Sequence, residues 1–369
     1  MSGLARRKPR PSTVPNRGRP SVGTVRVEPR SERLLRTGSL NSAVASLVGV
    51  ALFLFGGTWD ISWHIVAGRE SFWSPPHFAL YLGIVIIFGA GVHGFAKAWR
   101  RRVAPTPGAF ISATGAGVSL VSAPLDELWH RVYGLDVTVW SAPHLLLIGG
   151  VVLASFGAVV TGAHAHRHRS LPAPWLAFDA PWNGATAILI IGGGLMMGAA
   201  GATLAEFDFD VARFAVAWHP PILAGIASFG IALVGRASRR SGGAILAAAV
   251  YTLVRIAIDW VQRGLSMPRP DIPLVVVAAL AFEAVIAIAR ARWPGRTPGA
   301  MVAAGAGGAT AVFLGAVQWP YTTALAGAVW SGSVLALAAA PSILVAAVAA
   351  WTGWAIGRQI GDLAATGIP

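Results

Sequence analysis

The chain has 369 residues, of which 55% are hydrophobic and 12% are charged, and its mean hydropathy is +0.62. A soluble domain carries about twice that charged fraction, so the composition excludes an ordinary soluble protein. The formal net charge is +14, but the basic residues gather near the N-terminus and in alternate loops, as they do in membrane proteins, so we expect no nucleic-acid partner. The absence of cysteine excludes disulfides and thiolate metal sites.

Residues 1–38 form the first predicted region, a basic tail rich in Arg, Pro and Ser. Such a segment cannot bury an apolar core, so we expect it to be disordered, and its charge favours contact with anionic lipid. The first apolar run begins too far from the start for a cleaved signal peptide, so we expect that run to be retained. An organelle transit segment is the alternative for an Arg-rich, acid-poor start.

Beyond the tail, nearly all apolar residues lie in runs of about 17 to 25, the length that crosses roughly 30 Å of hydrocarbon as a helix. Because the backbone must satisfy its own hydrogen bonds in lipid, each run is predicted to be helical. The last run, 321–357, is too long for one crossing and predicts either two short spans turning near Pro341 or one span with a surface segment. The chain is therefore predicted to be an all-α polytopic bundle of about ten or eleven spans. The other runs are 41–64, 76–98, 108–130, 142–164, 183–205, 217–235, 243–262, 272–290 and 299–318.

The basic residues outside the spans predict the orientation. Beyond the tail, twelve Lys and Arg lie in loops on the tail's side of the membrane and five in the opposite loops. Positively charged loops stay in the cytoplasm. We therefore expect a multi-pass plasma-membrane protein with a cytoplasmic N-terminus.

A repeat carries most of the polar residues at the span ends. Residues 60–77 and 126–144 both fit D-x2-W-H-x-V-x-G followed by W-S-x-P-H, 66 residues apart and with one more residue in the second connection. So many matches in a short window indicate an internal duplication of a helix–hairpin–helix unit. The membrane part is thus divided into a duplicated four-helix metal-binding region, 39–170, and further transmembrane helices, 171–369.

Each copy of the repeat supplies one carboxylate and two imidazoles. An Asp and a His four residues apart share a helix face, and the Pro before the second His favours the start of the returning helix. The hairpin should therefore bring three ligands together at the outer membrane boundary, in a set that suits copper, zinc or non-haem iron. An Asp–His pair that merely satisfies a helix end is the structural alternative. The predicted ligands are Asp60, His64 and His77 in the first copy, and Asp126, His130 and His144 in the second.

The two ligand sets resemble those of the copper membrane monooxygenase family, specifically one metal-binding membrane subunit of the particulate methane and ammonia monooxygenases, over roughly residues 41–165. In that family the first set is Asp, His, His and the second is Asn, His, His, at the spacings found here. The resemblance implies copper, the oxidation of a small apolar substrate or ammonia by dioxygen, and assembly with other membrane or cupredoxin-like subunits into an oligomer. Two features depart from the family: Asp126 stands where it has Asn, and this chain has several more spans.

A third group of polar residues is predicted on the same side of the membrane. Glu206, Asp208 and Asp210 end one span, and His219 opens the next in the sequence W-H-P-P. The group echoes the repeat without its Asp-x3-His spacing. It predicts either an additional outer-face site or an acidic loop that caps the helices.

Three charged residues fall inside predicted spans. Arg255 and Asp259 lie four residues apart, so we expect them to pair on one helix face. Glu283 has no local partner, and Arg255 is the expected one. Intramembrane charges of this kind are either structural pairs or part of a substrate or proton path.

Three functions are consistent with these patterns. The first is a copper-dependent membrane oxidase or monooxygenase-like protein. The second is a transporter or metal-handling protein, although only five Met and no Cys leave few soft ligands for Cu(I). The third is a non-catalytic protein in which the metal holds two hairpins together.

Overall fold

The computed structural model describes residues 30–68, 73–102, 104–134, 138–167, 183–211, 215–325 and 331–366, and every regular element in these ranges is a helix. The predicted all-α bundle is confirmed. The elements are α1 (Arg30–Ala67), α2 (Pro75–Arg100), α3 (Pro107–Tyr133), α4 (Ala142–Arg167), α5 (Gly184–Gly201), η1 (Ala202–Leu204), α6 (Ala205–Asp208), η2 (Val216–Trp218), α7 (His219–Ser238), α8 (Gly243–Gly264), α9 (Val275–Arg292), α10 (Ala300–Leu325) and α11 (Gly332–Thr366).

Within the described ranges, nine helical stretches are long and apolar enough to cross a membrane. In two of them a short element extends a long helix, because α5 continues through η1 into α6, and η2 leads directly into α7. The remaining long helix, α9, has only 18 residues and carries Glu283, Arg290 and Arg292. The chain is therefore a multi-pass membrane protein.

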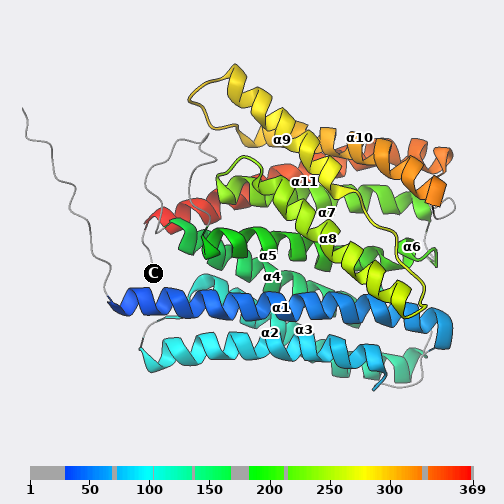
Figure 1. Ribbon diagram of the computed structural model, residues 1–369, viewed down its shortest axis with the longest axis horizontal. Helices are drawn as coiled ribbons and strands as arrows, with labels where there is room; N and C mark the ends of the chain where they lie inside the picture. The colour runs from blue at the N-terminus through cyan, green and yellow to red at the C-terminus, as the bar shows by residue number, and fades with distance from the viewer. Residues whose placement is uncertain are drawn as a thin grey trace, which may run out of the picture.

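The long helices lie side by side in one bundle, with α1, α2 and α3 along one edge and α9, α10 and α11 along the other (Figure 1). Neighbours in the chain pack as antiparallel hairpins, α1 on α2 and α3 on α4, while α7 packs chiefly on α11. α5 contacts α1, α4, α7 and α8, and so joins the two halves. The start of α1 and the end of α11 lie at one end of the bundle; the opposite end, which holds the α1–α2 and α3–α4 turns, is called the site end below.

Glycines bring the helices of each repeated hairpin into backbone contact. A Cβ atom added to Gly49 would lie 2.6 Å from the carbonyl oxygen of Gly83, and one added to Gly115 would collide with that of Gly150. Gly115 and Gly150 follow Gly49 and Gly83 by 66 and 67 residues, the offsets of the polar repeat. Small residues allow this close approach in lipid, and the shared contact extends the duplication from the turns into the middle of the helices.

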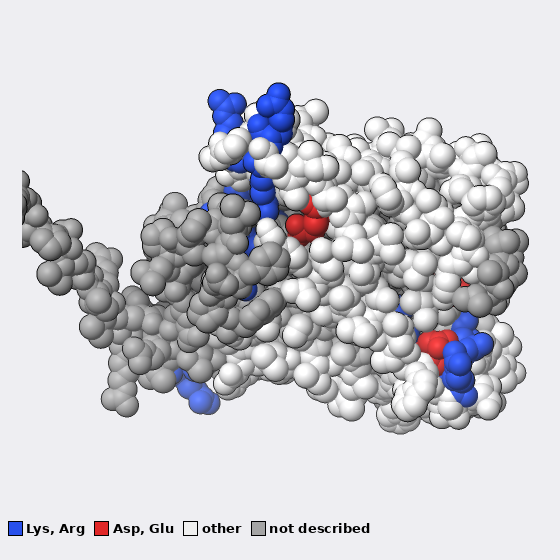
Figure 2. All heavy atoms as spheres, turned by 45° about the horizontal axis from the view of Figure 1, so that its top comes forward, with Lys and Arg blue, Asp and Glu red and all other residues white. Residues whose placement is uncertain are grey.

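The surface of the bundle fits a lipid environment. Figure 2 shows Lys and Arg gathered toward the two ends and a broad, largely uncharged surface between them. Large apolar side chains such as Leu82, Val85, Leu253 and Leu344 are more than half exposed on this surface. They would be costly in water and are stable against acyl chains.

Two predicted boundaries differ from the structure. α1 begins at Arg30, so residues 30–38 of the predicted tail are helical, while residues 1–29 lie outside the described ranges. The expected turn near Pro341 is wrong, because α11 runs through that residue from Gly332 to Thr366, and residues 321–325 belong to α10. A proline removes one backbone N–H, and within a packed transmembrane bundle neighbouring helices and local adjustments make its position in a helix tolerable.

Candidate metal centre

The two repeated hairpins open onto one cavity at the site end. Its volume is about 490 Å³, and it lies between α1, α2, α3, α4 and the α5–α6 and α8 segments. α2 begins two residues before His77 and α4 two residues before His144, as the Pro before each His predicts. The cavity wall includes all six predicted ligands: Asp60, His64, His77, Asp126, His130 and His144.

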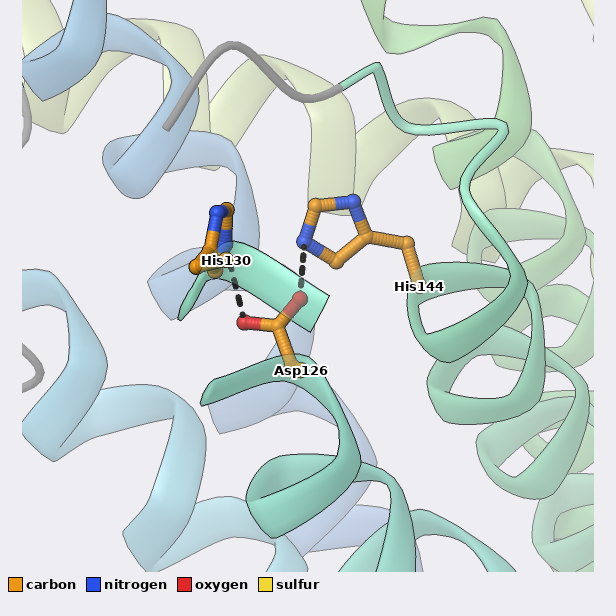
Figure 3. A group of neighbouring side chains, drawn as sticks. All are labelled: Asp126, His130 and His144. Carbon is orange, nitrogen blue, oxygen red and sulfur yellow. Dashed lines mark ion pairs between the residues drawn. The ribbon is translucent and has the colours of Figure 1, made fainter. Parts of the chain in front are cut away.

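The second copy forms the tighter group. Asp126 and His130 lie one turn apart on α3, and His144 reaches them from the first turn of α4 (Figure 3). Asp126 Oδ2 is 3.4 Å from His130 Nε2, and Asp126 Oδ1 is 3.2 Å from His144 Nε2. Within the ranges that the structure describes, these three residues form the one group of ligand atoms that all lie within 4.8 Å of one another. They are called the Asp126 set below.

Backbone hydrogen bonds fix how both imidazoles present their nitrogens. His130 Nδ1 lies 3.2 Å from the carbonyl oxygen of Gly134, and His144 Nδ1 lies 2.9 Å from that of Thr138. A carbonyl oxygen can only accept, so each Nδ1 carries the hydrogen, and in a neutral ring Nε2 is left with a lone pair. Two lone pairs then face the Asp126 carboxylate. That contact is repulsive unless a proton or a metal ion lies between the atoms.

The first copy, Asp60 with His64 and His77, is looser. His77 Nε2 is 3.1 Å from Asp60 Oδ1, and the His77 ring stacks on Tyr81 with the ring centres 5.5 Å apart. His64 Nδ1 donates to the backbone oxygen of Asp60 at 2.7 Å and lies 3.6 Å from its Oδ2. The side chain of His64 is 35% exposed, so this imidazole can turn more freely than those of the Asp126 set.

The third group is organised around an arginine. Asp208 Oδ1 lies 3.5 Å from His219 Nε2, and Asp208 Oδ2 lies 2.7 Å from Arg255 Nη2. The same guanidinium donates to the backbone oxygen of Asp271 at 2.6 Å. The side chains of Asp208 and His219 are each 1% exposed. Here a positive charge from the chain itself balances the carboxylate, so this pair needs no metal ion. Asp210 does not join it, because it lies exposed in a turn with φ of +56°.

The expected pairing of the intramembrane charges is wrong. Arg255 is buried and pairs with Asp208, whereas Asp259 lies toward the surface beside Arg263 and Arg269, at 3.1 and 3.7 Å. Glu283 lies toward the other end of the bundle, where it accepts hydrogen bonds from backbone N–H groups of residues 242 and 244 at the start of α8. The buried guanidinium takes the buried carboxylate because their attraction is strongest away from water.

Glu206 has a separate role at the cavity wall. Its Oε1 accepts hydrogen bonds from the Thr138 hydroxyl at 2.5 Å and from the Val139 N–H at 2.6 Å. The carbonyl oxygen of Thr138 in turn accepts from His144 Nδ1. A carboxylate from α6 therefore holds the connection that orients a candidate ligand. No local pattern pointed to this contact, because Thr138 and Glu206 are 68 residues apart.

No protein-family model, curated protein or solved structure matches the chain. What the site does is therefore inferred from its own residues.

Proposed function

We propose that this chain is a copper-binding membrane protein that holds its metal between Asp126, His130 and His144. The observation that carries the proposal is the pair of Nε2 atoms, 3.4 and 3.2 Å from the Asp126 carboxylate, on rings whose Nδ1–H groups are bonded to backbone carbonyls. Backbone contacts of this kind are the usual means of presenting a histidine to a metal. A bound cation would turn the mutual repulsion of the three donors into coordination.

The third hairpin offers an internal comparison that supports a cation at this site. Asp208 faces one imidazole, and Arg255 balances its charge at 2.7 Å. Asp60 and Asp126 each face two imidazoles. A carboxylate in the membrane is expensive unless a positive charge balances it. A metal ion in the first two hairpins would do what the guanidinium does in the third.

Copper is the metal that the resemblance to the copper membrane monooxygenases implies, and zinc and non-haem iron suit the same donors. Bound copper would supply a redox change and an open position for dioxygen. The protein's residues would orient the ligands, keep the other set, Asp60 with His64 and His77, across the same cavity, and enclose a small apolar substrate or ammonia. Electrons would come from a partner, such as a cupredoxin-like or second membrane subunit.

The proposed location of this site is the outer face of the plasma membrane. The excess of Lys and Arg in the loops at the opposite end of the bundle supports that orientation. A metal site facing outward would be open to metals and electron donors from outside the cytoplasm. Labelling a cysteine introduced at Ser74, in the first hairpin turn at the site end, with a membrane-impermeant maleimide on intact cells tests the orientation directly.

Metal analysis of the purified full-length protein tests the central proposal. We expect stoichiometric copper in the wild type and the loss of about one equivalent in His130→Ala, because the set then has too few ligands. The matched control is His93→Ala, which removes an exposed histidine of α2 that does not line the cavity. A wild-type protein without stoichiometric metal would overturn the proposal.

Further measurements separate the alternatives once metal is found. Dioxygen uptake that requires copper, a reductant and an apolar substrate supports oxidation. Metal that raises the unfolding temperature without dioxygen uptake indicates a purely structural site. Metal-dependent flux in liposomes indicates transport.

A further inference from the structure

We propose that the cavity shared by the two histidine sets binds an apolar molecule of about ten to fifteen non-hydrogen atoms, which is much larger than ammonia or a one-carbon substrate. The inference concerns binding. For any reaction of the bound molecule it rests on the proposed function, and it names the substrate class of that site.

The volume of the cavity sets the size of the ligand. At about 490 Å³ it falls within the range of pockets that enclose whole organic ligands. A water-sized group takes about 30 Å³ in a liquid, so the cavity has room for about sixteen such groups. Metal ions and their ligated solvent would fill only a small part of this space. A molecule of the size of ammonia would leave most of it empty.

The wall chemistry sets the polarity of the ligand. Most of the wall away from the two histidine sets is aliphatic or aromatic, and its polar members Glu206 and Arg255 make hydrogen bonds within the protein, to Thr138 and Val139 and to Asp208 and Asp271 respectively. An apolar cavity of this kind is poorly solvated and favours apolar ligands. The apolar wall residues include Phe53, Leu54, Ile61, Leu80, Leu147, Ile148, Val254 and Ile258.

Small residues at the wall create the space. Gly57 of α1 lines the cavity, and a Cβ atom added to it would meet nothing within 4 Å. Gly198 and Ala202, from α5 and η1, line the cavity as well. These two residues, with Val254 and Ile258 of α8, lie in the part of the chain beyond the duplicated hairpins. The later helices thus determine which molecule fits beside the ligands that the hairpins provide.

Photo-crosslinking of the full-length protein in lipid nanodiscs tests the inference. The probe is a decyl diazirine, and the labelled positions are mapped by mass spectrometry. We expect labels on the wall segments around Leu54, Ala202 and Val254. We also expect n-decane to compete with the probe, and ammonium or ethane not to compete.

The filling variant Gly57→Phe should weaken the probe's apparent affinity about tenfold or more, because the added ring takes space within the cavity. The matched control, Gly89→Phe, places the same ring at an exposed glycine of α2 with open space around it and should leave the labelling unchanged. Labelling of the wall that Gly57→Phe does not reduce, that n-decane does not displace, or that ethane displaces equally well would overturn the inference.

Metal content is measured on the same samples, which keeps the two proposals separate. Specific labelling in a protein that binds no metal leaves the size inference standing and removes the copper proposal. Stoichiometric copper without specific labelling has the opposite meaning.

Discussion

Replacing Arg255 with methionine should destabilise the bundle strongly, because it removes the positive charge from a buried group. Arg255 Nη2 lies 2.7 Å from Asp208 Oδ2 and also donates to the backbone oxygen of Asp271. Methionine keeps much of the length of the side chain but has neither charge nor donor. Asp208, with its side chain 1% exposed, would be left beside His219 without a guanidinium.

The expected cost follows from this burial. Removing one partner of a buried ion pair costs about 3–5 kcal/mol, whereas removing both partners is often close to neutral. Arg255→Met should therefore be much less stable than the wild type. The double variant Asp208→Asn with Arg255→Met should recover most of the loss, since the uncompensated carboxylate is then gone.

Unfolding of the purified protein in mixed micelles, followed by circular dichroism as the denaturing detergent is increased, measures these differences. Arg263→Met is the matched control, because Arg263 pairs with Asp259 on the same helix with its side chain 62% exposed, and should lose at most about 1 kcal/mol. An Arg255→Met variant that is no less stable than the Arg263→Met control would refute this reasoning. A double variant that loses the sum of the two single losses would refute it equally.

Three further predictions concern the site and its supports. Glu206→Ala should weaken copper binding by about 10–100-fold in a competitive titration, while Glu206→Gln, which keeps an acceptor oxygen, should stay near the wild type; equal losses in both would contradict the positioning role. Gly115→Leu should cost about 1–3 kcal/mol and displace the Asp126 set by forcing α3 from α4, whereas Gly117→Leu, with open space around it, should not. Burial, reinforced by a neighbouring carboxylate, raises the pKa of Asp271 to about 6; the folded protein then binds this proton more tightly than the unfolded chain, so stability should fall as pH rises from about 4 to about 6, and less steeply in Asp271→Asn.

Local sequence patterns determined the helices and the candidate ligands. Apolar runs of membrane length must form helices because lipid offers the backbone no hydrogen bonds, and the nine membrane-spanning stretches found in the described ranges follow the predicted runs. The spacing of Asp126 and His130 placed them on one helix face, and the Pro before His144 correctly predicted where α4 begins. The repeat itself was visible in the sequence, although its Gly115–Gly150 contact was recognised only from the packing.

Tertiary structure alone decided which residues meet across helices. The i,i+4 rule names neighbours on one helix, so it paired Arg255 with Asp259, while the folded chain brings Asp208 to Arg255 from 47 residues away. The support of His144 by Glu206 through Thr138 depends in the same way on a contact between distant segments. So do the shared cavity and the tighter closure of the second ligand set. Periodicity along a chain fixes the direction of a side chain from its own helix axis, but the distance to a partner on another helix depends on how all the helices pack.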